Sequence, residues 1–89
     1  MSLLKDRIVV VTGAGRGLGR AFAEDCGRQG AEVVIAEKNA EWGQQAEIEL
    51  RNAGHTARFF PVDVADPDSV NALSAELAKS YKRIDGLVN

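Results

Sequence analysis

The chain has 89 residues, of which 45% are hydrophobic and 27% are charged, and its formal net charge is −2. These values are typical of one soluble globular unit, and the mild acidity leaves no basic surface for the phosphates of a nucleic acid. No apolar run approaches the roughly 20 residues that a membrane-spanning helix needs, and Met1–Asp6 does not resemble a signal peptide. The single Cys26 excludes an internal disulfide and fits a reducing compartment, so we expect a cytoplasmic location.

The first predicted strand, Arg7–Thr12, contains a short run of β-branched apolar residues, which is typical of a strand buried on both faces. Glycines at every second position from Gly13 to Gly19 follow this strand. They lead into a helix that is predicted from about Gly17 to Gln29. A strand, a glycine turn and a helix in this order present backbone N–H groups and a positive helix end to a phosphate. The segment is therefore predicted to bind a phosphate group.

The spacing of these glycines distinguishes between known phosphate-binding loops. The motif G-x-G-x-x-G does not fit, because its third glycine would fall on Leu18 if counted from Gly13 and on Arg20 if counted from Gly15. A Walker loop does not fit either, because its Gly-Lys-Ser/Thr sequence is missing. The pattern that fits is Thr12-Gly13-x-x-x-Gly17-x-Gly19. With this pattern the chain resembles the short-chain dehydrogenase/reductase family, whose cofactor signature is T-G-x-x-x-G-x-G. A methyltransferase-like loop is a third alternative, which explains the last glycine less well.

Strands and helices alternate along the rest of the chain. Further strands are predicted at Glu32–Ala36 and Thr56–Val62, and a fourth opens at Gly86–Asn89. Helices are predicted at about Ala40–Ala53 and from Pro67 to about Tyr81, where Asp66 and the following proline form a strong start signal. Each helix carries a predicted inward stripe at helical spacing: Leu18, Ala21, Phe22 and Cys26 in the first, Trp42, Ala46, Leu50 and Ala53 in the second, and Val70, Leu73, Leu77 and Tyr81 in the third.

This alternation with short links predicts an α/β fold with a doubly wound parallel sheet of the Rossmann-like type. Because the sequence stops within the fourth strand, the sheet is expected to be incomplete. Residues 1–89 are interpreted as the N-terminal part of a single dinucleotide-binding domain. An isolated half-fold that pairs edge to edge with a second copy is the alternative.

Glu37 follows the second strand at about the place where a dinucleotide-binding fold has the acid that binds the adenosine ribose. A carboxylate there accepts from the ribose hydroxyls and repels a 2′-phosphate, which favours NAD over NADP. Arg16 favours the opposite, because a basic residue at this position of the family often accompanies NADP. Neighbours on an extended strand point to opposite faces, so Lys38 is not expected to line the same ribose as Glu37. The alternative is that Glu37 is a solvated charge at a strand end.

The resemblance implies further cofactor contacts. The family's Asp-Val pair, which matches Asp63-Val64, places its aspartate at the adenine amino group, although Asp63 could equally cap the following turn. Thr12 matches a residue that braces the glycine turn, and Asn89 matches the first residue of an Asn-Asn-Ala-Gly segment beside the cofactor. The expected cofactor-binding set is Thr12, Gly13, Gly15, Arg16, Gly17, Leu18, Gly19, Glu37, Asp63, Val64 and Asn89.

For the whole protein, the resemblance implies hydride transfer between a nicotinamide cofactor and a small alcohol or carbonyl, in a homodimer or tetramer. The family's serine and its Tyr-x-x-x-Lys pair carry the chemistry. Tyr81 has Asp85 at the position of that lysine, so no catalytic residue is assigned and the 89 residues alone are expected to be inactive. The alternative is a non-catalytic nucleotide-binding or sensing module, or an inactive truncation product. No metal site is predicted, because no Cys, His and carboxylate residues have metal-ligand spacing.

Overall fold

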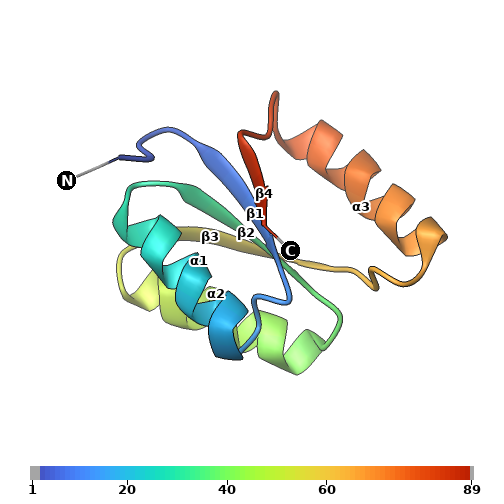
Figure 1. Cartoon of the computed structure of the whole chain (residues 1–89), viewed down its shortest axis with the longest axis horizontal. Coiled ribbons are helices and arrows are strands. Elements are labelled where there is room, and N and C mark those ends of the chain that lie inside the picture. The colour runs from blue at the N-terminus through green and yellow to red at the C-terminus, as the bar shows by residue number, and fades with distance from the viewer. Residues whose placement is uncertain (1–2, 89) are drawn as a thin grey trace.

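A computed structural model describes residues 3–88 of the chain. Strands and helices alternate in the order β1 (Ile8–Thr12), α1 (Gly17–Arg28), β2 (Glu32–Glu37), α2 (Ala40–Asn52), β3 (Thr56–Pro61), α3 (Pro67–Ser80) and β4 (Gly86–Val88). The described strands pair in parallel in the order β3-β2-β1-β4 (Figure 1). The predicted Rossmann-like α/β arrangement is confirmed, and the observed boundaries of each element lie within one residue of the predicted ones.

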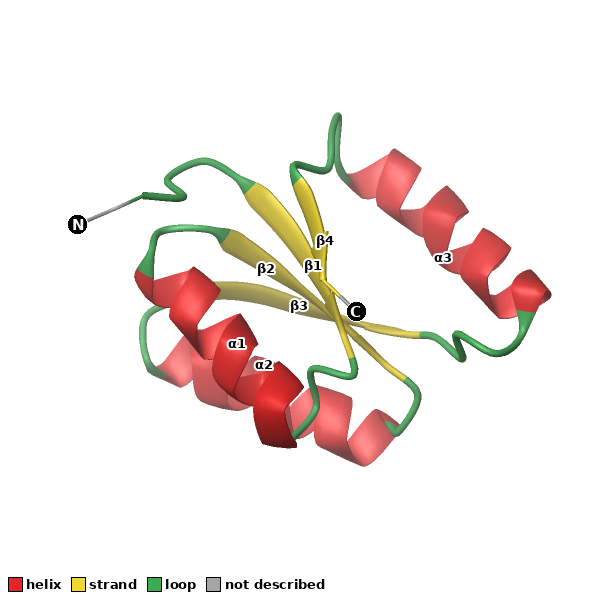
Figure 2. Cartoon of the chain, in the orientation of Figure 1, coloured by secondary structure: helices red, strands yellow, loops and turns green. Residues whose placement is uncertain are grey.

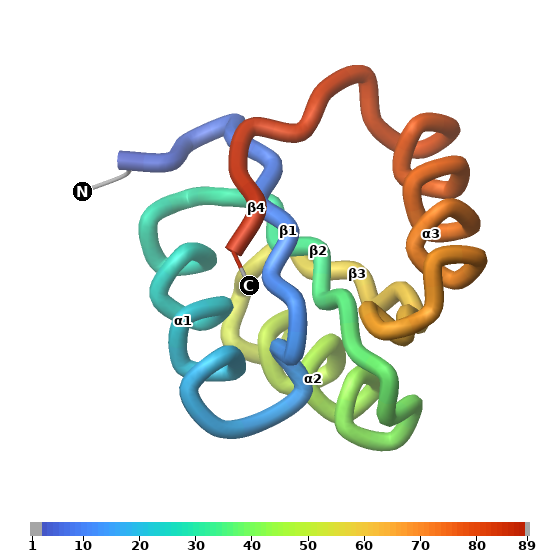
Figure 3. The backbone as a smooth tube through the Cα atoms, turned by 45° about the vertical axis from the view of Figure 1, so that its right-hand side comes forward, coloured from blue at the N-terminus to red at the C-terminus, as the bar shows by residue number. Residues whose placement is uncertain are grey.

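The two faces of the sheet are covered by different helices. Figures 2 and 3 show α1 and α2 on one face and α3 on the other. Because successive side chains of a strand point to opposite faces, Val9 and Val11 of β1 pack with α1 and α2, whereas Val10 belongs to the cluster beneath α3. The same division holds in β2, where Ile35 faces α1 and α2 and Val34 faces α3. Burial on both faces explains the continuous apolar runs of these strands.

Small residues, rather than large apolar ones, form the sheet-facing side of α1. Its buried residues are Ala23, Cys26 and Gly27, whereas Leu18 is 88% exposed and Phe22 is 44% exposed. The predicted inward stripe is therefore wrong for Leu18 and Phe22, and also for the exposed Ala21. The physical reason is that α1 lies too close to the glycine turn and the sheet for large side chains to fit between them.

Helix α2 packs both small and large residues against the sheet. Its buried face consists of Gly43, Ala46 and Leu50, whereas Trp42 is 39% exposed and Ala53 is exposed. A Cβ on Gly43 would lie 2.2 Å from the Phe59 ring of β3, so only glycine allows the observed approach. The predicted inward stripe is confirmed for Ala46 and Leu50 and wrong for Trp42 and Ala53.

Helix α3 begins as predicted but covers its face of the sheet loosely. The Asp66 side chain accepts a hydrogen bond from the Asp68 N–H at 3.0 Å, and Pro67 is the first helical residue. Leu73 and Leu77 are partly buried against the sheet, and α3 contributes no fully buried residue. An apolar groove of about 490 Å³ lies between helix and sheet. Across residues 3–88, none of the helices combines the length and apolar character that crossing a membrane requires.

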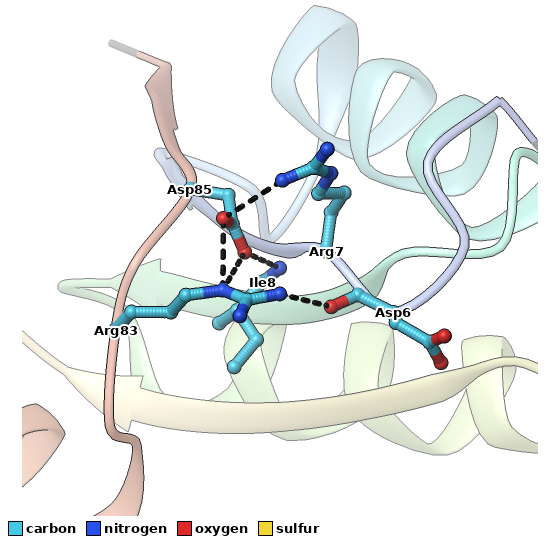
Figure 4. A network of polar contacts seen from close by, with 5 residues as sticks. All are labelled: Asp6, Arg7, Ile8, Arg83 and Asp85. Carbon is cyan, nitrogen blue, oxygen red and sulfur yellow. Dashed lines mark hydrogen bonds and ion pairs between the residues drawn. The ribbon is translucent and has the colours of Figure 1, made fainter.

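A polar cluster around Asp85 joins the segment before β1 to the segment before β4 (Figure 4). The Asp85 carboxylate accepts hydrogen bonds from the Ile8 N–H at 2.8 Å, from Arg83 Nε at 3.1 Å and from Arg7 at 3.4 Å. Arg83 also donates to the backbone carbonyl of Asp6 at 3.4 Å. The cluster ties the edge strand β4 to β1 at the amino end of the sheet.

This cluster predicts a dependence of stability on acid. The Ile8 amide, followed by the Arg83 guanidinium, holds the pKa of Asp85 below its ordinary value of 3.8. A carboxylate with a lowered pKa stabilises the fold above its unfolded-state pKa, and that contribution disappears as the pH falls through the folded-state pKa. When the pH is lowered below about 4, we expect the midpoint temperature of thermal unfolding to fall. The fall should be smaller in Asp85→Asn. Asp25→Asn, at an exposed position on α1, serves as the control and should keep the full drop. An equal drop in both variants would show that Asp85 is not the titrating group.

Candidate functional site

The glycine loop between β1 and α1 requires glycine at different positions for different reasons. Gly13 and Gly17 have φ values of +64° and +66°, in the left-handed region that favours glycine. Gly19 has no such requirement, but a Cβ there would lie 2.3 Å from the carbonyl oxygen of Gly13. The first two residues thus shape the turn, and the third allows the start of α1 to pack on it.

The amino end of α1 is free to receive an anion. Its N-cap residue, Arg16, forms no side-chain capping hydrogen bond, and the first turn contains no acidic residue. The first N–H groups of a helix have no partner within the helix, and the helix dipole makes this end positive. Two N–H groups earlier in the loop are already used, because Gly13 donates to the Ala36 carbonyl at 2.8 Å and Gly15 donates to Glu37. The donors that remain for a phosphate lie at the later end of the loop.

Glu37, at the end of β2, is a buried carboxylate with only 8% of its surface exposed. Its Oε1 accepts from the Gly15 N–H at 2.9 Å, and its Oε2 accepts from the Asn39 N–H at 3.1 Å. Burying a carboxylate is costly unless it is hydrogen-bonded, and these two amides meet that need. The alternative of a solvated charge at a strand end is therefore wrong.

A cleft of about 440 Å³ lies beside Glu37, and the residues that line it come from the carboxyl ends of β1, β2 and β3 and from the loops that follow them. They are Thr12, Gly13, Ala36, Glu37, Lys38, Val62, Asp63 and Val64. In open parallel sheets, ligands bind outside the carboxyl ends of the strands. The cleft therefore brings the start of the glycine loop, Glu37 and the Asp63-Val64 pair to one place.

Lys38 lines this cleft together with Glu37, so the argument from strand alternation that separated the two residues is wrong, while their contacts with a ribose stay a prediction. Strand β2 ends at Glu37, and the alternation of side chains does not extend into the loop that holds Lys38. The Lys38 Nζ lies 3.6 Å from Asp63 Oδ2, and Asp63 Oδ1 accepts from the Ala65 N–H at 3.0 Å. Asp63 therefore does cap the following turn, while its contact with an adenine stays a prediction. Val64 beside it is 65% exposed.

Other predicted site residues are distributed around the loop. The Thr12 hydroxyl donates to the Val88 carbonyl at 3.1 Å and so joins the ends of β1 and β4. Leu18 does not reach the cleft beside Glu37 but lines a separate hollow of about 270 Å³, with Phe22 among its neighbours. Asn89 lies outside the described residues, so its predicted role is unchanged.

Sequence reasoning missed one neighbour of the loop. The guanidinium carbon of Arg16 lies 4.2 Å from the centre of the Trp42 ring, a cation–π contact between the glycine loop and α2. A tryptophan at helical spacing from Ala46 and Leu50 was indistinguishable from a core residue. Trp42 packs against the loop so closely that a Cβ on Gly15 would lie 2.7 Å from the Cβ of Trp42.

The comparisons with known proteins agree with this arrangement. The L-rhamnose 1-dehydrogenase (NAD(P)(+)) of Azotobacter vinelandii is 42% identical over 91 residues, which cover 98% of this chain and 36% of the relative. A 3beta-hydroxysteroid dehydrogenase of Mediterraneibacter gnavus is 37% identical over 89 residues, which cover 100% of this chain and 32% of the relative. The chain therefore spans about a third of the length of these curated relatives.

Solved structures share the backbone arrangement. A metagenomic short-chain oxidoreductase in complex with NADP is similar with a TM-score of 0.90 and 34% identity, over 97% of this chain and 39% of that one. A citronellol catabolism dehydrogenase of Pseudomonas aeruginosa is similar with a TM-score of 0.96 and 28% identity, over 99% of this chain and 37% of that one. The family model described as short chain dehydrogenase matches residues 7–89. The chain belongs to the short-chain dehydrogenase family.

Proposed function

We propose that residues 1–89 are the N-terminal, dinucleotide-binding part of an oxidoreductase that interconverts an alcohol and a carbonyl by hydride transfer, with NAD as its cofactor. One observation carries the proposal: the glycine loop and the buried Glu37 carboxylate meet beside a single cleft at the carboxyl ends of the strands. This is where a dinucleotide-binding fold holds its ligand. Membership of the short-chain dehydrogenase family supports the class of reaction.

The described residues have the chemistry that each part of the cofactor needs. The free amides at the start of α1 would hold the pyrophosphate, and the helix dipole adds on the order of 0.3–2 kcal/mol. Glu37 retains acceptor capacity for the ribose hydroxyls, because each carboxylate oxygen has two lone pairs and accepts only one hydrogen bond from a backbone N–H group. The exposed Val64 and the neighbouring Asp63 would flank the adenine.

The charges around the cleft favour NAD over NADP. A 2′-phosphate at about 4 Å from the Glu37 carboxylate would be repelled by roughly 4 kcal/mol for each pair of unit charges, at an effective dielectric constant of about 20 and before screening. The cation nearest to Glu37 in sequence, Lys38, is already paired with Asp63. Arg16 opposes this preference but lies against the Trp42 ring. The balance supports NAD.

Glu37→Ala tests this preference in the whole protein. Removing the carboxylate removes both the acceptor for the ribose diol and the repulsion of a 2′-phosphate. We expect the ratio of kcat/KM with NADP to kcat/KM with NAD to rise at least about tenfold, which corresponds to about 1.4 kcal/mol. Glu41→Ala is the matched control, because Glu41 is an exposed acid in the first turn of α2. An unchanged ratio in Glu37→Ala would remove the basis for NAD.

The proposal also covers the reaction of the whole protein, the inactivity of residues 1–89 alone, and the location and assembly of the whole protein. When bound, the nicotinamide ring supplies the hydride chemistry, and a small alcohol or carbonyl is the substrate. Tyr81 is no candidate for the proton transfer, because it lies at the end of α3, does not line the cleft beside Glu37 and has Asp85 at the position of the family's lysine. Residues 1–89 should therefore bind a dinucleotide without turning it over. The family resemblance supports a homodimer or tetramer, and the single cysteine supports a cytoplasmic location.

A further inference from the structure

The two carboxylate oxygens of Glu37 bind parts of the chain that are distant from each other along the backbone. Oε1 holds the Gly15 N–H in the middle of the glycine loop, and Oε2 holds the Asn39 N–H at the start of α2. Asn39 is itself the N-cap of α2, and its side chain accepts from the Trp42 N–H at 3.1 Å. Glu37 thus joins the loop, the end of β2 and the start of α2.

The loop is packed tightly at the point where Glu37 holds it. A Cβ on Gly15 would lie 2.6 Å from Glu37 Oε1 and 2.7 Å from the Cβ of Trp42. The next residue, Arg16, places its guanidinium over the Trp42 ring. Hydrogen bonding and close packing therefore fix the loop against α2.

We propose that Glu37 is a positioning residue for the glycine loop: it holds the loop in its binding conformation before a dinucleotide arrives, separately from its contact with the ribose. The identity of the ligand rests on the proposed function, whereas the restraint on the loop does not. Glu37 can hold the loop and bind the ribose at the same time, because one hydrogen bond to each carboxylate oxygen leaves a lone pair free on both. Holding the loop in advance reduces the ordering cost of binding.

Hydrogen exchange in the ligand-free chain separates this role from ribose binding. A residue that served the ribose alone would leave the Gly15 amide unaffected when it is replaced. Glu37→Gln keeps the shape of the side chain but sets an NH₂ group against one of the two amide donors. We expect exchange at the Gly15 N–H, measured by NMR without any dinucleotide, to become at least about tenfold faster, since bonds to charged groups are among the stronger ones.

Two further variants complete the test. Glu41→Gln removes an exposed carboxylate from the first turn of α2 and should leave Gly15 exchange unchanged. Glu37→Asp keeps the charge but is one methylene shorter, so it should accelerate Gly15 exchange as Glu37→Gln does. The amides of Val33 and Val34, at the centre of β2, report whether the sheet stays folded.

The outcomes are distinct from those of the cofactor assay. Faster exchange at Gly15, with Val33 and Val34 unchanged, supports the positioning role even if the preference for NAD proves wrong. Unchanged exchange at Gly15 in both Glu37→Gln and Glu37→Asp, with the sheet folded, overturns it. Equal acceleration at Gly15 and in the centre of β2 in both Glu37 variants also overturns it, because Glu37 would then hold the whole sheet rather than the loop.

Discussion

Gly19→Ala is expected to disrupt the packing of α1 on the glycine loop, with a loss of about 3 kcal/mol in the free energy of unfolding. The added Cβ would lie 2.3 Å from the carbonyl oxygen of Gly13 and 2.9 Å from its carbonyl carbon. Both are backbone atoms, so no side-chain rotation relieves the clash and the helix must move away from the turn. Urea denaturation followed by circular dichroism measures the loss, and the affinity for NAD should fall with it.

Gly17→Ala is the matched comparison for this prediction. Gly17 lies in the same loop with a φ of +66°, but a Cβ there would have no atom within 4 Å. Gly17→Ala should lower the free energy of unfolding by about 1–2 kcal/mol, because alanine is disfavoured in the left-handed region. The larger loss should therefore belong to Gly19→Ala, and the reverse order would mean that the close approach of α1 is not what requires glycine.

Leu50→Ala is expected to cost about 2–5 kcal/mol, a large part of the stability of a small domain. Leu50 has 0% of its surface exposed and packs in the cluster between α2 and the sheet, together with Val33 and Ile35. Truncation removes its apolar contacts and leaves a cavity in the core. The midpoint of urea unfolding should fall accordingly.

Ile48→Ala provides the control on the same helix. Ile48 is 54% exposed, so the same loss of aliphatic carbon should change the free energy of unfolding by about 0.5 kcal/mol or less. Comparable losses in Leu50→Ala and Ile48→Ala would contradict the assignment of the buried face of α2.

The order and bounds of the elements were predictable because the local signals are strong. The apolar strands, the glycine turn and the Asp66-Pro67 start of α3 each specify a local structure, and all three are confirmed. The faces of α1 and α2 were predictable only in part: Cys26, Ala46 and Leu50 are buried as expected, whereas the residues beside the glycine loop depend on how closely the loop and the helices pack. Leu18 and Trp42 were expected inside and lie at the edges instead.

The candidate site was predictable in position but not in its contacts. The place of Glu37 after β2 indicated its position at the cleft, since the carboxyl ends of parallel strands meet at one edge of the sheet. No local pattern indicated that its oxygens bind the amides of Gly15 and Asn39, because these contacts depend on how the loop packs against α2. Lys38 was misplaced because β2 ends one residue before it.

The most direct test of the central claim is an NMR titration of the ¹⁵N-labelled chain with NAD. If the loop receives the pyrophosphate and the cleft receives the adenosine, saturable shifts should appear in the amides of Arg16–Gly19 and Lys38. The amides around Asp85, at the opposite end of the sheet, should stay unchanged. A lack of saturable shifts in the loop, or shifts confined to the groove beneath α3, would contradict the proposed function.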